Sequence, residues 1–161
     1  SLRIDYYRKG REWPYKNVKP RIIVEKYMED KNSETMRDYK FFCFNGKPEY
    51  IAYYKDRNLN DLKVAFYDVN WKKQPFVVAA KVIDHEIEKP KNINEMLKIA
   101  ELLSKEYPFS RVDLYQLNDG SIKFGEITFT SNAGVGKWAP EEYNSILGEK
   151  IVLPTKKDII K

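Results

Sequence analysis

The chain has 161 residues, a formal net charge of +5, and 33% charged and 14% aromatic residues. This length and composition are typical of one globular domain with a real core, and they exclude an intrinsically disordered chain. No run of 18 apolar residues occurs, so no transmembrane segment is predicted.

The N-terminal residues differ from the rest of the chain. Residues 1–19 are basic and aromatic without a clear period, so we treat them as a separate segment and residues 20–161 as the domain. After Pro20, the apolar run over residues 21–28 predicts the first strand. The polar pair Glu25-Lys26 interrupts this run, which is ordinary at an exposed strand end.

A hairpin is predicted next, with strands over residues 38–44 and 48–54. The Asn45-Gly46 pair between them is typical of a two-residue type I′ turn, which would place Cys43 opposite Pro48. The aromatic neighbours of Cys43 favour a buried structural thiol. A single cysteine excludes an internal disulfide and agrees with a reducing, cytoplasmic compartment.

Two helices are predicted in the second half of the chain. Asn92 with Glu95 resembles a capping box, and apolar residues follow at helical spacing over residues 93–103. A shorter helix is predicted after Pro140, ending before Gly148. With a further short strand over residues 64–68, these elements predict an α+β fold, a mostly antiparallel sheet with helices packed on one side.

The last predicted hairpin carries the most informative pattern. Asp119-Gly120 separates two strand-like runs and is typical of a two-residue type I′ turn. Counting back from that turn places Asp113 directly opposite Glu126. Like charges in opposed positions destabilise a sheet, so a bound cation or a shared proton is expected to offset their repulsion.

The same register places Arg111 opposite Thr128. Two carboxylates and a hydroxyl are ligands that Mg²⁺ accepts beside a phosphate chain. The alternative is a solvated strand face on which Asp113 and Arg111 only pair with their neighbours. The sequence supports these two interpretations about equally.

Lys40 lies on the 38–44 strand and shares its face with Asp38 and Phe42. A lysine that faces a cleft is a natural phosphate ligand. The more common alternative is a surface lysine whose charged end reaches solvent. No zinc cluster, Gly-x-Ser-x-Gly motif or P-loop occurs. The basic charge favours anionic partners such as nucleotides or acidic glycans, but no nucleic-acid-binding signature is present.

Seven runs together resemble the TupA-like branch of the ATP-grasp superfamily, which is associated with teichuronopeptide and capsular polysaccharide biosynthesis. In the family's order, the runs are residues 10–15, 20–30, 38–48, 66–71, 109–115, 124–129 and 140–143. The family's N-terminal lobe, with its phosphate-binding lysine and glycine loop, has no counterpart before Tyr6. The resemblance therefore implies the C-terminal part of an ATP-grasp fold, with a missing N-terminal lobe or a homo-oligomer as the expected partner.

The resemblance also implies ligands for individual residues. Glu25, Lys26, Tyr27 and Met28 match the segment that holds adenine, and Asp38 matches a residue near the ribose.

Catalytic and metal-binding residues are implied in the same way. Lys40 and Arg111 match residues near the phosphates and the second substrate, where they would act in catalysis. Asp113 and Glu126 match the Mg²⁺ carboxylates. Thr128 stands where the family usually has an asparagine, and a hydroxyl is a weaker ligand than an amide oxygen. The Pro-Gly that commonly follows is replaced by residues 131–134.

The implied activity is that of an ATP-dependent carboxylate–amine ligase that acts through an acyl phosphate on an envelope-polysaccharide precursor, with ATP and Mg²⁺ as cofactors. Whether this segment is active alone stays open. Two alternatives in the same pathway are a glycosyltransferase and a non-catalytic module that binds an anionic glycan through Trp13, Trp71, Trp138 and the tyrosines.

Overall fold

The computed structural model describes residues 6–26, 37–55, 62–78 and 80–155. Its centre is a six-stranded sheet in the order β5-β3-β2-β1-β6-β7. All neighbouring strands in it are antiparallel except β3 and β5, which are parallel. The strands of this sheet are β1 (Arg37–Phe44), β2 (Lys47–Lys55), β3 (Lys63–Asp68), β5 (Lys81–Val82), β6 (Phe109–Gln116) and β7 (Ile122–Thr128).

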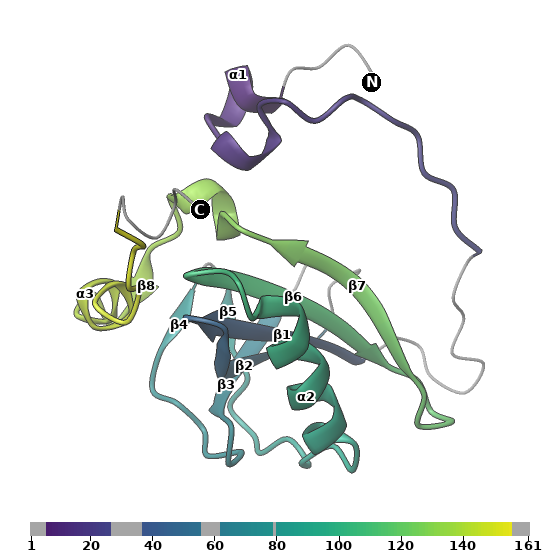
Figure 1. Cartoon of the computed structure of the whole chain (residues 1–161). Coiled ribbons are helices and arrows are strands. Elements are labelled where there is room, and N and C mark those ends of the chain that lie inside the picture. Colours follow the sequence, from purple (N-terminus) through teal and green to yellow (C-terminus); the bar gives the residue numbers. More distant parts are fainter. Residues whose placement is uncertain (1–5, 27–36, 56–61, 79, 156–161) are drawn as a thin grey trace.

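Smaller elements surround this sheet (Figure 1). A second, two-stranded sheet pairs β4 (Val77–Val78) with β8 (Trp138–Ala139). The helices are α1 (Tyr6–Gly10), α2 (Ile93–Ser104) and α3 (Tyr143–Gly148), with 3₁₀ turns η1 (Trp13–Tyr15) and η2 (Ser131–Gly134).

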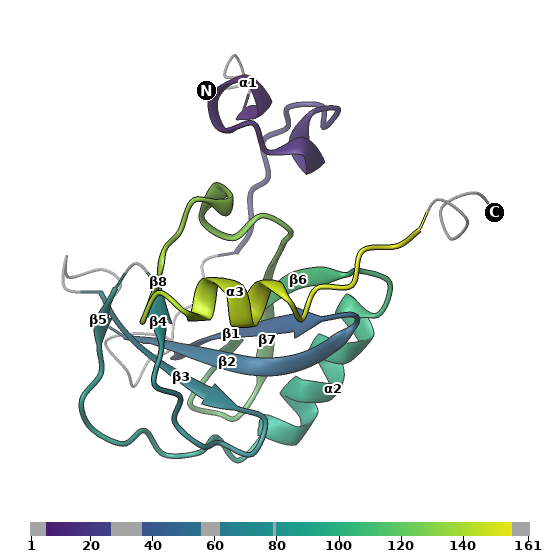
Figure 2. The same cartoon turned by 90° about the vertical axis from the view of Figure 1, so that its left-hand side faces the viewer.

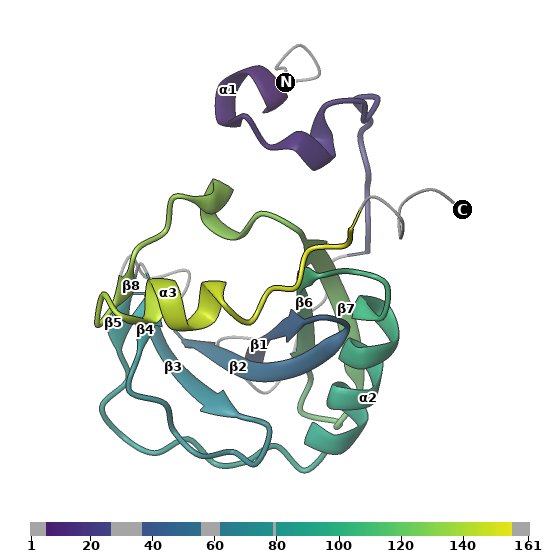
Figure 3. The ribbon, with the colours of Figure 1, turned by 60° about the vertical axis from the view of Figure 1, so that its left-hand side comes forward.

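Alternation along β1 divides the core between the two faces of the sheet. Tyr39, Phe41 and Cys43 point to one face, where they pack against Ile93, Met96 and Ala100 of α2. Phe42 and Phe44 point to the other face, where Leu147 of α3 covers them. Figure 2 and Figure 3 show α2 and α3 on opposite sides of the sheet.

The predicted α+β class with a mostly antiparallel sheet is therefore confirmed, and the long helix α2 covers one face as expected. The short helix α3 is on the opposite side. Continuous burial along β1 after Arg37 explains why, since both faces of the strand carry large apolar side chains that must be covered (Figure 3).

The first hairpin follows the sequence closely. Asn45 and Gly46 both have positive φ, as a type I′ turn requires, and Cys43 pairs with Pro48. Cys43 is fully buried, as predicted. Beyond that pair, Glu49 is an extra residue that shifts the register by one.

The predicted strand over residues 21–28 is wrong for its described part. Residues 21–26 pair with no described strand, and Ile22, Ile23 and Val24 are between 76% and 88% exposed. An apolar run indicates that a strand is favourable, but a strand also needs a hydrogen-bonded neighbour, which one run does not specify. Tyr27 and Met28 lie outside the described residues. The division of the chain at residue 20 stays a prediction.

The capping box was also predicted wrongly. Asn92 makes no side-chain hydrogen bond to the first turn of α2. Its amide Nδ2 instead donates to the carbonyl oxygen of Gly120 at the tip of the β6–β7 hairpin. The side chain ties two elements together because the hairpin offers an acceptor that a local pattern cannot reveal.

The tip of that hairpin differs from the expected two-residue turn. Gly120 has a positive φ but Asp119 does not, and the Gly120 amide donates to the Leu117 carbonyl. The loop therefore has three residues and not two. Gly125 is an extra residue in β7 that shifts the register back, so Asp113 still pairs with Glu126 and Arg111 with Thr128.

Candidate functional site

A charged cluster lies on the same face of the sheet as α3. The helix covers one end of that face, and the cluster lies at the other end. Lys40 of β1 is the direct neighbour of Asp113 on β6, and their side chains form an ion pair. Asp38 Oδ1 lies 3.3 Å from Lys40 Nζ. Lys40 and Asp113 are 2% and 1% exposed, so neither the surface-lysine alternative nor the solvated strand face holds for this pair.

Arg111 joins this cluster to the second predicted carboxylate. Its Nε lies 2.7 Å from Asp113 Oδ1, and its Nη2 donates to both Asp113 Oδ2 and Glu126 Oε1 at 2.8 Å. The opposed carboxylates are thus held by a guanidinium, and neither the expected cation nor a shared proton is required to offset their repulsion. The geometry is the bidentate pairing that arginine favours with carboxylates.

Burial and charge act in opposite directions on Arg111. Burial alone would lower the pKa of the guanidinium, but the hydrogen bonds and the negative charge of Asp113 more than offset this, so its pKa is raised. Arg111 therefore stays charged throughout the range in which proteins are stable.

Glu126 differs from Asp113 in its exposure. Its side chain is 60% exposed, and its Oε1 also accepts a hydrogen bond of 3.0 Å from Thr128. The cluster thus has a buried part, formed by Lys40, Arg111 and Asp113, and a solvent-facing rim, formed by Glu126 and Thr128.

The rim has the donor chemistry that Mg²⁺ needs, because a carboxylate and a hydroxyl are hard oxygen ligands. Both oxygens of Asp113, by contrast, already accept from cationic side chains. No group of three or more His, Cys, Asp or Glu in the described ranges could hold a metal ion. Mg²⁺ commonly binds to one or two carboxylates together with substrate phosphates. The rim therefore suits Mg²⁺ as one part of a ligand set that is completed by phosphates.

The structure brings together six of the predicted site residues: Asp38, Lys40, Arg111, Asp113, Glu126 and Thr128. Glu25 and Lys26 lie in the exposed, unpaired stretch of residues 21–26, and no contact joins them to the cluster among the described residues. Tyr27 and Met28 lie outside the described part of the chain.

Two residues of the site were missed by the sequence analysis. Ser131 Oγ accepts a 3.1 Å hydrogen bond from Arg111 Nη1, and Lys40 Nζ lies 5.3 Å from the ring centre of Tyr54. Tyr54 pairs with Asp38 across β1 and β2 only because the extra residue Glu49 shifts the register, whereas counting from the Asn45-Gly46 turn places Tyr53 opposite Asp38. Ser131 had no pairing signal because it begins the irregular turn η2.

The N-terminal segment reaches the same end of the molecule. Glu12 Oε2 accepts a 2.7 Å hydrogen bond from Thr130, just past β7. Tyr15 has a raised pKa, first because of its partial burial and then because of the negative charges of Glu12 and Glu126. A contact between residues 118 positions apart places the segment over the site, in agreement with its position in Figure 1.

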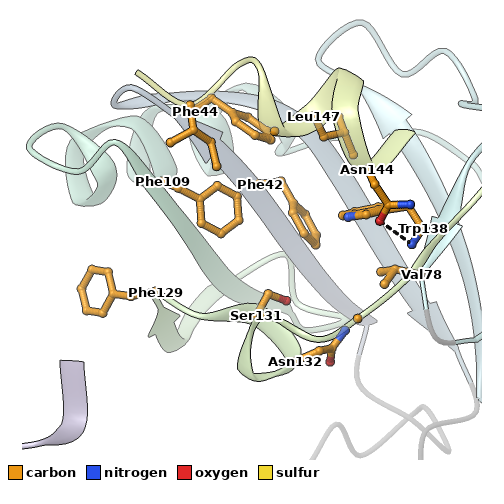
Figure 4. A pocket seen from close by; sticks show the side chains of 14 residues that line it. Phe42, Phe44, Val78, Phe109, Phe129, Ser131, Asn132, Trp138, Asn144 and Leu147 are labelled. Carbon is orange, nitrogen blue, oxygen red and sulfur yellow. Dashed lines mark hydrogen bonds between the residues drawn. The ribbon is translucent and has the colours of Figure 1, made fainter. Parts of the chain in front are cut away.

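A pocket of about 320 Å³ adjoins the cluster on the same face (Figure 4). Phe42 and Phe109 rise into it from the sheet, Ser131 and Asn132 border it from η2, and Leu147 closes it from α3. Phe42 on β1 pairs with Arg111 on β6, and Phe109 lies two residues before Arg111 on β6. The guanidinium is linked to this largely apolar hollow through Ser131, which lines the hollow and accepts a hydrogen bond from Arg111.

Comparison with known proteins identifies the family of the chain. The sequence profile described as TupA-like ATPgrasp matches residues 1–152. The chain belongs to the TupA-like ATPgrasp family. No curated protein and no solved structure matched this TupA-like ATP-grasp chain. In its described part, none of the helices is long and apolar enough to cross a membrane.

Proposed function

We propose that this chain belongs to an ATP-dependent carboxylate–amine ligase of cell-envelope or capsular polysaccharide biosynthesis that acts in the cytoplasm. One observation carries the proposal: Lys40 and Arg111 are buried side by side on a face that also carries Glu126 at its rim, in a chain of an ATP-grasp family. Lys40 and Arg111 are the cations that a phosphate chain would meet there, in competition with Asp38, Asp113 and Glu126, which already pair with them.

In this proposal the γ-phosphoryl group of ATP moves to a carboxylate oxygen of the substrate, and ADP leaves. An amine then attacks the carbonyl carbon of the acyl phosphate, and inorganic phosphate leaves. Negative charge develops on oxygen in both steps. Arg111 stabilises that charge without reorganisation, because Asp113 already fixes its guanidinium, and Lys40 does so after it moves from Asp113 to the phosphate.

Mg²⁺ would neutralise part of the phosphate charge when bound. Glu126 and Thr128 are proposed to hold it at the rim, and Asp113 is proposed as the further ligand. Asp113 can serve in this way only if Lys40 moves from its carboxylate to the phosphate. The competition between Asp113 and a phosphate for Lys40 thus links nucleotide binding to the freeing of a metal ligand.

The residues proposed for the nucleoside end of ATP come from the resemblance of the sequence to the family. Glu25, Lys26, Tyr27 and Met28 are proposed to contact adenine, and Asp38 the ribose. The exposed apolar stretch at Ile22, Ile23 and Val24 suits a segment that gains a neighbouring strand from an N-terminal lobe or from a second copy of the chain.

A non-catalytic glycan-binding module is the less favoured alternative. Such a module stacks sugars on exposed aromatic faces. Trp71 instead stacks on Tyr67 at 4.3 Å and donates its indole N–H to the Ile87 carbonyl, which leaves Trp13 as the strongly exposed tryptophan among the described residues. No observation on the described residues favours sugar transfer.

Titration calorimetry with Mg²⁺ and a non-hydrolysable ATP analogue tests the proposal. We expect binding to the unaltered chain, a loss of at least tenfold in Glu126→Gln, and a similar loss in Lys40→Met. Glu49→Gln is the matched control, because Glu49 is a partly exposed carboxylate on β2 that pairs with Lys150 and lies outside the cluster. Equal affinity in all four chains would contradict the proposal.

A further inference from the structure

The pocket beside Arg111 has the composition of a ring-binding site. Its floor is formed by the aromatic side chains of Phe42 and Phe109, and Leu147 closes one side (Figure 4). Phe42 and Leu147 are almost completely buried, so the apolar surface is fixed by the core behind it. Its volume of about 320 Å³ lies at the lower end of the range for small-molecule pockets, which suits a single ring with short substituents.

One edge of the same pocket is polar and lies next to a guanidinium. Ser131 lines the pocket and accepts a 3.1 Å hydrogen bond from Arg111 Nη1. Because the oxygen of Ser131 accepts from a cation, its own O–H is polarised and oriented to donate elsewhere. A hydroxyl beside a guanidinium is a suitable partner for a carboxylate, and charge-assisted hydrogen bonds of this kind are about twice as strong as neutral ones.

These two features define one occupant. We propose that the pocket holds the ring of a small carboxylic acid, with its carboxylate at Ser131 and Arg111 and the face of its ring against Phe42 and Phe109. The inference rests on the proposed function, because it names the class of the acid that is to be phosphorylated. The acid lies with its carboxylate toward the Lys40–Arg111 pair, where a phosphoryl group would arrive, and with its ring away from it.

The position of Arg111 supports this orientation. The guanidinium binds Asp113 through Nε and Nη2 and Ser131 through Nη1. Its Nε side is therefore held by the buried cluster, and its Nη1 donates to Ser131, which lines the pocket. A ligand carboxylate at Nη1 does not need to break the bidentate pair with Asp113, so binding leaves the buried charges balanced.

A matched set of three carboxylates and one neutral amide tests the ligand class without nucleotide. Benzoate, cyclohexanecarboxylate, acetate and benzamide are titrated into the chain, with two-dimensional NMR as the readout. We expect benzoate to bind with millimolar or better affinity and to shift the Trp138 indole and the Ser131 amide. Acetate lacks the ring and benzamide lacks the charge, so both are expected to bind at least tenfold more weakly. Comparable binding of cyclohexanecarboxylate would identify a saturated ring as equally acceptable.

Two variants locate the binding. Ser131→Ala is expected to weaken benzoate about tenfold through the loss of a charge-assisted hydrogen bond. Its control is Ser145→Ala, which removes an exposed hydroxyl from α3. Leu147→Phe fills the pocket and is expected to abolish binding, with circular dichroism to show that the chain is folded.

The proposal is overturned if benzoate does not bind at 10 mM, if acetate or benzamide binds as well as benzoate, or if Ser131→Ala leaves its affinity unchanged. These outcomes are separate from the nucleotide titration. Benzoate in the pocket without nucleotide binding would support the acid-binding site and contradict a nucleotide site in this segment alone. Nucleotide binding without benzoate binding would support the nucleotide site and exclude the pocket as the site of the acid.

Discussion

Asp113 and Glu126 lie directly opposite each other on β6 and β7, and one nitrogen, Arg111 Nη2, donates to both carboxylates at 2.8 Å. The two acids nevertheless have different environments, since Asp113 is buried with two cations and Glu126 faces solvent. Asp113 is therefore a structural carboxylate, and Glu126 is a carboxylate that a ligand can reach. The same substitution should change the stability of the fold differently at the two positions.

Replacing Asp113 is expected to destabilise the fold. Removal of one of two opposed like charges would by itself make Asp113→Asn neutral or slightly stabilising. In the structure it leaves Lys40 and Arg111 buried without their shared partner, and such a loss costs about 3–5 kcal/mol. Glu126→Gln is the control and should change the free energy of unfolding by about 0–1 kcal/mol, because Glu126 is mostly exposed. Urea unfolding measures both values, and equal effects would contradict the assignment.

Asn92 can be tested as a bridge between α2 and the hairpin. Asn92→Asp should be tolerated if the residue capped the helix, because Asp and Asn cap equally well. Its Nδ2 instead donates to the Gly120 carbonyl, and a carboxylate cannot donate. We expect Asn92→Asp to lower the free energy of unfolding by about 1 kcal/mol or more, at least as much as Asn92→Ala. A stabilised Asn92→Asp variant would restore the capping interpretation.

Gly46 and Gly148 form a matched pair of glycines. Gly46 has a φ of +78°, and a Cβ there would lie 2.7 Å from the Lys105 carbonyl oxygen. Gly46→Ala should therefore cost about 1–3 kcal/mol. Nothing lies within 4 Å of a Cβ at Gly148 in α3, so Gly148→Ala should be neutral or stabilising by up to about 1 kcal/mol. Thermal unfolding of both variants checks the difference, and a destabilised Gly148→Ala would be the unexpected result.

Ionisation of Cys43 is expected to lower the stability of the fold at alkaline pH. Burial raises the pKa of its thiol from 9.0 to about 11. The unfolded chain therefore ionises first, and the stabilisation present below pH 9 is lost as the pH rises toward 11. The loss is on the order of 2–3 kcal/mol, at about 1.4 kcal/mol per pKa unit.

The Cys43→Ala variant isolates this effect. Its loss of packing is independent of pH, so its unfolding free energy should decline less steeply between pH 9 and 11 than that of the unaltered chain. Parallel slopes would exclude the thiol as the cause. In the folded chain Cys43 should also resist alkylation at pH 8, since the thiolate is the reactive form.

The sequence predicted local structure better than contacts between distant segments. The β1–β2 turn was right because Asn45-Gly46 determines its own geometry. The opposition of Asp113 and Glu126 was also right, although the turn type was wrong, because the longer loop and the extra Gly125 shift the register in opposite directions.

The pairing of β1 with β6 could not be predicted, because it joins segments about 70 residues apart and no local pattern specifies it. For that reason the Lys40–Asp113 ion pair was missed, although both residues had been singled out. The same limit applies to Asn92, whose acceptor at Gly120 lies 28 residues away.

The extra residue at Gly125 has a consequence for the shape of the pocket. A bulge bends its strand and increases the local twist, and Figure 1 shows β7 as a curved strand from whose end the chain continues to η2. This curvature carries Phe129 and Ser131 across the front of the hollow, where both line it. A regular hairpin would run straight and leave a shallow, open face, so the depth available to a ligand depends on one small residue outside the pocket.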